Sequence, residues 1–254
     1  MSDQALAQQL ANAREQRIQV DAAPFETIAS LDEAYAIQAL ASTAYPSTQI
    51  GYKVGATNEA VQKLFGSDTP FYGPMFESER YAPDAQFDLV TGLLGGEAEF
   101  AFKVGTDFPT EPLLNIDALP ELIDSLNIAV ELVGRRTRGD GLPTLHAAIA
   151  DFGANVAFIE GPPIDNWTSI DLAQVVVTAC TNGEKTNSGT GAAVLGHPLN
   201  SLLWLHNSLL DVGSGLKAGD WVSTGTCLGV IKAVPQSTVD ISFSGCGEIS
   251  YQLI

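Results

Sequence analysis

The chain has 254 residues, 45% of them hydrophobic, and a formal net charge of −18. This length allows one large domain or two small ones with a real core. The acidity argues against a nucleic-acid partner, because phosphate contacts need a basic surface, and it disfavours anionic membranes. Three scattered cysteines, Cys180, Cys227 and Cys246, form neither a metal spacing nor an even disulfide set. We therefore expect a reduced, cytoplasmic protein.

The N-terminal region predicts helices rather than a targeting segment. Its first residues lack a signal-peptide pattern, and no apolar run in the chain approaches the ~20 residues that cross a bilayer. Helical spacing extends over residues 1–45. Within it, Ser30 and Glu33 form a capping box that opens a helix through about Ala41.

A short strand and a second helix are expected next. Residues 50–55 predict the strand, and Thr57 is expected to cap a helix that stops at Gly66. Residues 67–74 hold two prolines and a glycine and predict a loop. A soft boundary near residue 75 then separates a mainly helical portion, 1–75, from a β-rich portion, 76–254.

The β-rich portion is interrupted by two predicted helices, one at about 117–126 and one that follows His197-Pro198. Strands of irregular spacing with few helices favour an α+β chain whose core is a folded-over sheet. The expected strands cover roughly 98–104, 128–133, 155–160, 173–180, 221–231, 238–243 and 247–253.

Two acids, Glu97 and Glu99, stand two residues apart in a strand-like segment. Because a strand has a side-chain period of two, both carboxylates project from one face. A third acid, Glu131, lies in the run 128–133. Like charges this close raise one another's pKa, and a divalent cation removes that penalty. Ligands that are all oxygen favour a hard cation, Mg²⁺ or Mn²⁺. The alternative is an ordinary half-exposed strand.

Lys53 lies between Gly51 and Gly55 on one face of its predicted strand. Because glycine neighbours carry no side chain, a small ligand has room to reach the ammonium group. The alternative is a surface lysine whose glycines serve turn geometry.

A glycine-rich segment, 187–192, contains Ser188 and Gly189 and precedes a predicted helix. Small residues expose backbone N–H groups that can bind an anion such as a substrate carboxylate. The alternative is a plain hairpin with its turn at 182–183. Val194 stands where a dinucleotide fingerprint needs its third glycine, which excludes nucleotide binding.

Four residues are weaker candidates. Asp151 is either an acid near the site or the cap of a helix end. Arg136, in the arginine run 135–138, either clamps a substrate carboxylate or belongs to a solvated turn. His146 and His197 are possible bases, although the proline after His197 favours a structural hydrogen bond.

Several segments, taken in order, resemble the hydratase/decarboxylase branch of the fumarylacetoacetate hydrolase superfamily. That branch includes 2-keto-4-pentenoate hydratases and 4-oxalocrotonate decarboxylases. The Glu-x-Glu pair and the Leu-Gly-His-Pro-Leu-Asn motif at 195–200 are its most specific matches. The other matching segments are 51–57, 65–73, 130–134, 150–151 and 188–191.

The resemblance implies a mixed β-sandwich roll with a helical N-terminal portion, assembled as a homo-oligomer. It also implies a Mg²⁺ or Mn²⁺ ion held by three acids, which match Glu97, Glu99 and Glu131, and a lysine that matches Lys53. One departure bears on the substrate. Relatives usually carry Asp-Asn-Ala-Ser where this chain has Asp-Phe-Gly-Ala at 151–154.

The activity implied by the resemblance is hydration of a 2-hydroxy-alkadienoate or 2-oxo-alkenoate. The carboxylate and 2-oxygen of such a substrate can chelate the ion, which stabilises the enolate as a Lewis acid, and Lys53 adds to that stabilisation. The same enolate serves decarboxylation and acylpyruvate-type C–C hydrolysis, which are the enzymatic alternatives. A non-catalytic partner subunit is the alternative from another class.

Overall fold

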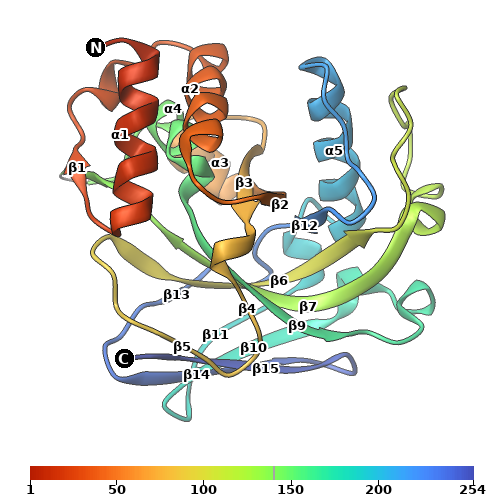
Figure 1. The fold of residues 1–254 in the computed structure, drawn as a ribbon. Coiled ribbons are helices and arrows are strands. Elements are labelled where there is room, and N and C mark those ends of the chain that lie inside the picture. The colour runs from red at the N-terminus through yellow and green to blue at the C-terminus, as the bar shows by residue number, and fades with distance from the viewer. Residues whose placement is uncertain (140) are drawn as a thin grey trace.

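The computed structural model describes residues 1–139 and 141–254. Figure 1 shows helices at the top, a large curved sheet across the middle and a smaller sheet below it. None of the described helices is both long enough and apolar enough to cross a membrane. The helices are α1 (Asp3–Gln16), α2 (Leu31–Ala44), α3 (Glu59–Phe65), α4 (Leu145–Ala150) and α5 (Pro198–Asp211).

The described strands form two main sheets and one short pair. The large sheet contains, in spatial order, β3 (Phe71–Phe76), β2 (Gln49–Gly55), β12 (Trp221–Ser223), β6 (Leu93–Val104), β7 (Ile123–Gly134), β9 (Asn155–Pro163) and β4 (Arg80–Tyr81), with β13 (Val230–Lys232) also paired to β6. The smaller sheet contains β11 (Glu184–Thr190), β10 (Val176–Thr181), β14 (Ser237–Phe243), β15 (Gly247–Leu253) and β5 (Ala85–Phe87). β1 (Val20–Asp21) and β8 (Thr137–Arg138) form the short parallel pair.

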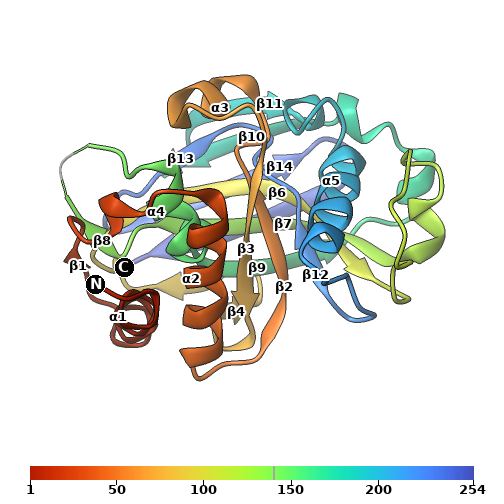
Figure 2. The same cartoon turned by 90° about the horizontal axis from the view of Figure 1, so that it is seen from above.

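The two faces of β6 have different environments. The even-numbered residues Ala98, Phe100 and Phe102 are fully buried in the main core, where Phe100 packs edge-on against Phe243 of the smaller sheet. The odd-numbered residues, which include the two glutamates, face the opposite side. Figure 2 shows the helices lying over the large sheet. The period-two prediction and the α+β class with a helical N-terminal portion are both confirmed.

Helix starts follow local capping. The Ser30 hydroxyl accepts a hydrogen bond from the Glu33 N–H, and the Glu33 carboxylate accepts one from the Ala29 N–H, as a capping box does. The predicted cap at Thr57 is wrong by one residue. Asn58 caps α3 by accepting from the Val61 N–H, and Gly66 ends this helix in the left-handed conformation as expected.

Two predicted elements are wrong because sheet pairing overrides local pattern. The expected helix at 117–126 is only a single 3₁₀ turn, Leu119–Leu122, followed at once by β7, whose first residues extend the pairing with β6. The expected loop at 67–74 contains most of β3. Pro74 is tolerated there because β3 lies at the edge of the sheet, where a missing N–H breaks no ladder.

The expected strand at 221–231 is two short strands, β12 and β13, joined by a turn through Gly225 and Gly229, both at positive φ. The strand expected at 173–180 begins later, at Val176. The soft boundary near residue 75 falls inside β3, and β2 and β3 pair within the same sheet as β6 and β7.

Candidate metal centre and active site

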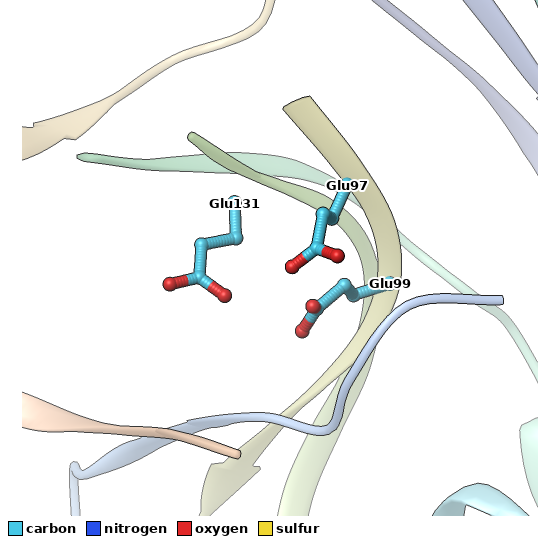
Figure 3. A group of neighbouring side chains, drawn as sticks. All are labelled: Glu97, Glu99 and Glu131. Carbon is cyan, nitrogen blue, oxygen red and sulfur yellow. The ribbon is translucent and has the colours of Figure 1, made fainter. Parts of the chain in front are cut away.

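The three acids converge on one point above the large sheet. Glu97 and Glu131 are directly opposite each other on β6 and β7, and Glu99 follows two residues along β6. One carboxylate oxygen from each lies within 4.8 Å of the others. Figure 3 shows the three carboxylate groups turned toward a common space. Strand register alone produces this arrangement, since period two places all three on one face.

Hydrogen bonds orient Glu99 and Glu131, and Glu99 keeps one unpartnered oxygen. Glu99 Oε2 accepts hydrogen bonds from Ser223 Oγ (2.6 Å) and the Gly225 N–H (2.8 Å), while its Oε1 has no hydrogen-bond partner among the described residues. Glu131 Oε1 accepts from the Asn155 side chain at 3.0 Å. A buried, unpartnered carboxylate oxygen beside two other acids fits a metal ligand, because leaving it bare is costly.

Burial makes the ionised trio unfavourable without a cation. Desolvation raises the pKa of Glu97 to about 7, with Lys53 opposing the shift and Glu131 adding to it. Desolvation also raises the pKa of Glu99 well above its usual value, reinforced by the two other acids, and raises the pKa of Glu131 despite the nearby lysine. An oxygen-only donor set of this kind suits a hard divalent cation.

These shifts predict how Mg²⁺ changes thermal stability with pH. A raised carboxyl pKa means that the folded, metal-free protein binds more protons than the unfolded chain, so its stability falls as pH rises from about 4.5 through about 7. Mg²⁺ binds the ionised form. We expect Mg²⁺ to raise the melting temperature more at about pH 8 than at about pH 5.5, measured against EDTA. Equal shifts at both pH values, or a Glu97→Gln variant with the same pH dependence, would contradict this.

Lys53 lies within the acid cluster rather than on the surface. It is 2% exposed, and its Nζ is 3.1 Å from Glu131 Oε2 and donates to the Gly153 carbonyl at 3.0 Å. Burial by itself lowers the pKa of Lys53, but the three acids outweigh it and raise that pKa above its usual value. Three carboxylates and one ammonium leave two negative charges, which a divalent cation balances.

A left-handed turn supplies the carbonyl that holds Lys53. Phe152, Gly153 and Ala154 all have positive φ, at 52°, 64° and 63°. This conformation costs a non-glycine residue about 1–2 kcal/mol. Packing compensates, because the Phe152 ring is fully buried and lies 4.6 Å from the Arg14 guanidinium. A side chain on Gly73 would meet the Phe152 carbonyl at 2.2 Å, so this close approach requires glycine.

Asn155 links the acid trio to helix α1. Its side-chain N–H donates to Glu131, and its Oδ1 accepts from Arg14 Nη2 at 2.7 Å. The Arg14 guanidinium also pairs with Glu79. Sequence analysis missed both Asn155 and Arg14. The available signal was an arginine four residues after Leu10 and eight after Leu6, on the apolar face of a predicted helix.

We therefore predict that Asn155 positions Glu131 for the cation. Asn155→Leu should weaken Mg²⁺ binding by about 10–100-fold, the usual effect of removing a hydrogen bond to a metal ligand. Isothermal titration of the EDTA-stripped protein measures this without turnover. Asn12→Leu, on the exposed side of α1, serves as the control. Unchanged Mg²⁺ affinity in a folded Asn155→Leu protein would show that Glu131 is oriented by other contacts.

Asp151 and Arg136 bind each other. Asp151 is the C-cap of α4, and its two oxygens accept from the Arg136 N–H (2.6 Å) and Nη1 (2.9 Å). Arg136 Nη2 also donates to the Asn155 carbonyl at 2.6 Å. Burial raises the pKa of Asp151, against the lowering effect of Arg136. This ion pair holds the ends of the turn at 152–154.

Two further candidates from the sequence, Ser188 and Gly189, make no hydrogen bond to the three acids in the described structure. Ser188 is exposed on β11 with its hydroxyl 3.4 Å from Thr178 Oγ1. Gly189 packs against the Cys227 carbonyl, and the Cys227 N–H donates to Ala98 between the two β6 acids. Asn182 and Gly183, both at positive φ, form the hairpin turn before β11.

Both candidate histidines make structural hydrogen bonds. His197 Nδ1 accepts from the Leu199 N–H and caps α5, as the following proline suggested. His146 Nδ1 lies 2.9 Å from the Ile28 carbonyl. Neither ring has a hydrogen bond to an acid of the trio.

No protein-family model matches the chain, but individual proteins do. It is 30% identical to a 2-keto-4-pentenoate hydratase of Paraburkholderia phymatum over 237 residues, 88% of this chain and 90% of the relative. It is 27% identical to the 2-keto-4-pentenoate hydratase of Paraburkholderia xenovorans over 224 residues, 87% of this chain and 82% of the relative.

The comparison of folds leads to proteins of the same family as these relatives. A 4-oxalocrotonate decarboxylase from Pseudomonas putida G7, complexed with magnesium and adipate, superposes with a TM-score of 0.90 at 25% identity, over 99% of this chain and 97% of that one. The relatives, the fold and the matching segments lead to one conclusion. The chain belongs to the hydratase/decarboxylase branch of the fumarylacetoacetate hydrolase superfamily and is an enzyme of this type.

Proposed function

We propose that the chain is a metal-dependent hydratase that adds water to a 2-hydroxy-alkadienoate or 2-oxo-alkenoate. The observation that carries this proposal is the acid trio with Lys53 inside it, which has two uncompensated negative charges in a buried setting. The hydratase names of the relatives support the substrate class. The enzyme resemblance leaves little support for a non-catalytic partner subunit.

Glu97, Glu99 and Glu131 would hold the cation, which we propose to be Mg²⁺ or Mn²⁺. A similar protein is described as complexed with magnesium. When bound, a divalent ion supplies Lewis-acid stabilisation of negative charge on a 2-oxo acid. The donor set fits this role, because it offers only oxygens and one of them, Glu99 Oε1, has no partner among the described residues.

Lys53 would act on the same negative charge. Its ammonium is fixed by two acceptors, the Glu131 carboxylate and the Gly153 carbonyl, and an ammonium has three donors. Among the described residues these two acceptors leave a third N–H for the substrate 2-oxygen, where negative charge develops when the dienol hydroxyl loses its proton. A fixed, buried cation stabilises such charge better than water does, since it needs no reorganisation.

The other candidates would serve in support. We propose that Asp151 and Arg136 position the Lys53-binding turn rather than touch substrate, because each already satisfies the other. Ser188 and Gly189 remain proposed contacts for a substrate carboxylate. Their support is the packing of Gly189 on the segment that also donates to Ala98 between the metal ligands.

Decarboxylation of a 2-oxo acid is the second candidate. The observation that favours it is the superposition with a 4-oxalocrotonate decarboxylase over nearly the whole chain. Both reactions pass through the same conjugated enolate, so the metal ligands and Lys53 serve either one. An acylpyruvate-type C–C hydrolase would use these groups too.

One assay tests the proposal. EDTA-stripped protein is supplied with Mg²⁺ and with 2-hydroxy-alkadienoates or their 5-carboxylated counterparts, and dienol absorbance and CO₂ are followed together. Metal-dependent loss of absorbance without CO₂ supports the hydratase. Release of CO₂ supports the decarboxylase, and turnover that EDTA leaves unchanged would overturn both.

We also propose a cytoplasmic location and a homo-oligomeric state. All three cysteines are free thiols, which suits a reducing compartment. The oligomer is supported by the family resemblance. Light scattering of the purified protein tests it, and a monomer at micromolar concentration would contradict it.

A further inference from the structure

An aromatic ring stands beside the ammonium group of Lys53. On the β2–β3 pair, Lys53 is directly opposite Gly73, and Gly55 is directly opposite Phe71. Cross-strand partners and residues two apart share a face, so all four lie on the face from which Lys53 reaches the acid trio. The centroid of the Phe71 ring is 5.6 Å from Lys53 Nζ. Because the other two residues are glycines, Phe71 is the side chain that borders the ammonium on this face.

The Phe71 ring is held in place from two sides. A side chain on Gly55 would meet the tip of the ring at 2.6 Å, so the ring fills the space over this glycine. Phe65 of α3 packs edge-on against it, with the two ring centroids 5.9 Å apart. Figure 2 shows α3 at one end of the β2–β3 pair. The room that the sequence predicted beside Lys53 is therefore bounded by an apolar, nearly buried ring.

Lys53 has no donor left for a second carboxylate on the substrate. Its ammonium contacts the Glu131 carboxylate and donates to the Gly153 carbonyl, and the proposed function uses the third donor on the 2-oxygen. Arg14 and Arg136, which are also buried, are already in ion pairs with carboxylates. A negative charge placed against the ring would therefore lose its water without gaining a partner from these cations.

We propose that Phe71 selects the tail of the substrate, favouring an uncharged, apolar chain beyond the 2-oxo group over one that ends in a carboxylate. This assignment rests on the proposed function, in which the carboxylate and 2-oxygen of a 2-oxo acid face the acid trio and Lys53. A hydrogen bond from Nζ places the 2-oxygen about 3 Å from the ammonium, which brings the chain carbons beyond it within reach of the ring. Apolar carbons gain by covering the ring.

Binding of saturated 2-oxo acids, which lack the diene, tests this without turnover. EDTA-stripped protein reloaded with Mg²⁺ is titrated calorimetrically with pyruvate, 2-oxohexanoate and 2-oxoadipate, which share one head and differ in the tail. We expect 2-oxohexanoate to bind at least about tenfold more tightly than 2-oxoadipate, because the terminal carboxylate of the latter is desolvated without a partner. It should also bind more tightly than pyruvate, because its longer tail covers the ring.

Two replacements locate the preference at Phe71. Phe71→Gln puts an amide beside the tail and should lower the ratio of 2-oxohexanoate to 2-oxoadipate affinity by about tenfold, with pyruvate affinity kept within about threefold. Phe71→Leu keeps this surface apolar and should keep the ratio within about threefold. Phe108→Gln, at a similarly buried phenylalanine that packs on His206, is the matched control for the loss of a core ring.

The outcomes separate this assignment from the proposed function. Equal affinity for 2-oxohexanoate and 2-oxoadipate in the unaltered protein, or an unchanged ratio in a folded Phe71→Gln protein, would overturn the role of Phe71 and leave the proposed function in place. If none of the three acids shows Mg²⁺-dependent binding to the unaltered protein, the proposed function is overturned and this assignment with it.

Discussion

Replacing Glu99 by glutamine is expected to abolish Mg²⁺ binding at millimolar concentrations while making the metal-free protein more heat-stable. The amide has the same shape and can still accept from Ser223 and Gly225, but it removes a buried charge whose pKa desolvation pushes well above its usual value. A side chain that binds the ion directly contributes more to affinity than a hydrogen bond that only orients it. The Mg²⁺ affinity should therefore fall by at least about a hundredfold. Activity that depends on the cation falls with it.

The gain in stability follows from the repulsion within the trio. Removing one of three crowded, desolvated carboxylates relieves repulsion that only a cation otherwise relieves. Relief of about 1 kcal/mol raises the melting temperature by about 2–4 °C in a protein of this size. Melting curves in EDTA and in Mg²⁺ measure both effects, with exposed Glu59→Gln as the control. A Glu99→Gln protein that melts at a lower temperature in EDTA and is still stabilised by Mg²⁺ would contradict the assignment of Glu99 to a metal site.

Lys53→Met should give the opposite pattern. The methionine keeps an unbranched side chain but removes the ammonium, so turnover should fall by about 10²–10³-fold, as when one electrostatic donor to a reacting oxygen is lost. Mg²⁺ affinity should rise, because a positive charge 3.1 Å from Glu131 no longer competes with the ion. The metal-free protein should melt at a lower temperature, since three acids then lack their cation.

Steady-state kinetics at saturating Mg²⁺ together with calorimetric Mg²⁺ titration separate these effects. The matched control is Lys217→Met, a surface lysine paired with Asp107. A Lys53→Met protein that keeps kcat within a few-fold would exclude a catalytic role for Lys53. Weaker Mg²⁺ binding in this variant would show that the ammonium supports the ligands rather than competing with the ion.

The sequence was sufficient to predict that Glu97 and Glu99 share one face, because that geometry is local. Two glutamates on one strand must share a face, and Glu131 meets them through the pairing of β6 with β7. The strand containing Lys53 was predicted by the same alternation. The Ser30 cap was predictable too, since its hydrogen bonds span only a few residues.

The contacts that fix these groups could not be predicted from local pattern. Asn155 meets Glu131 from 24 residues away and Arg14 from 141 residues away. Helix and strand periods relate residues only a few positions apart, so they cannot predict contacts at these sequence separations. The strand β3 was hidden by its proline, which is acceptable because no described strand pairs on the outer side of β3. The helix expected at 117–126 failed for a similar reason, since pairing with β6 outweighs weak local preference.

The turn at 152–154 is held by the packing of its own aromatic side chain. Phe152 places its ring beside two guanidinium groups, 4.6 Å from Arg14 and 5.2 Å from Arg136. The backbone, rather than a side chain, then faces Lys53. Replacing Phe152 by asparagine would therefore remove a fully buried ring from this packing.

The hydrogen bonds of Arg14 give the first helix a role that reaches beyond covering the sheet. Its guanidinium joins Glu79 to Asn155, whose side chain holds Glu131. A protease could cut the chain between α1 and α2, or a bulky fusion partner could keep α1 from packing on the sheet. Either change would leave all three acids in place but weaken binding of the ion. Preparations that look folded but need excess magnesium should be checked first for an intact amino-terminal end.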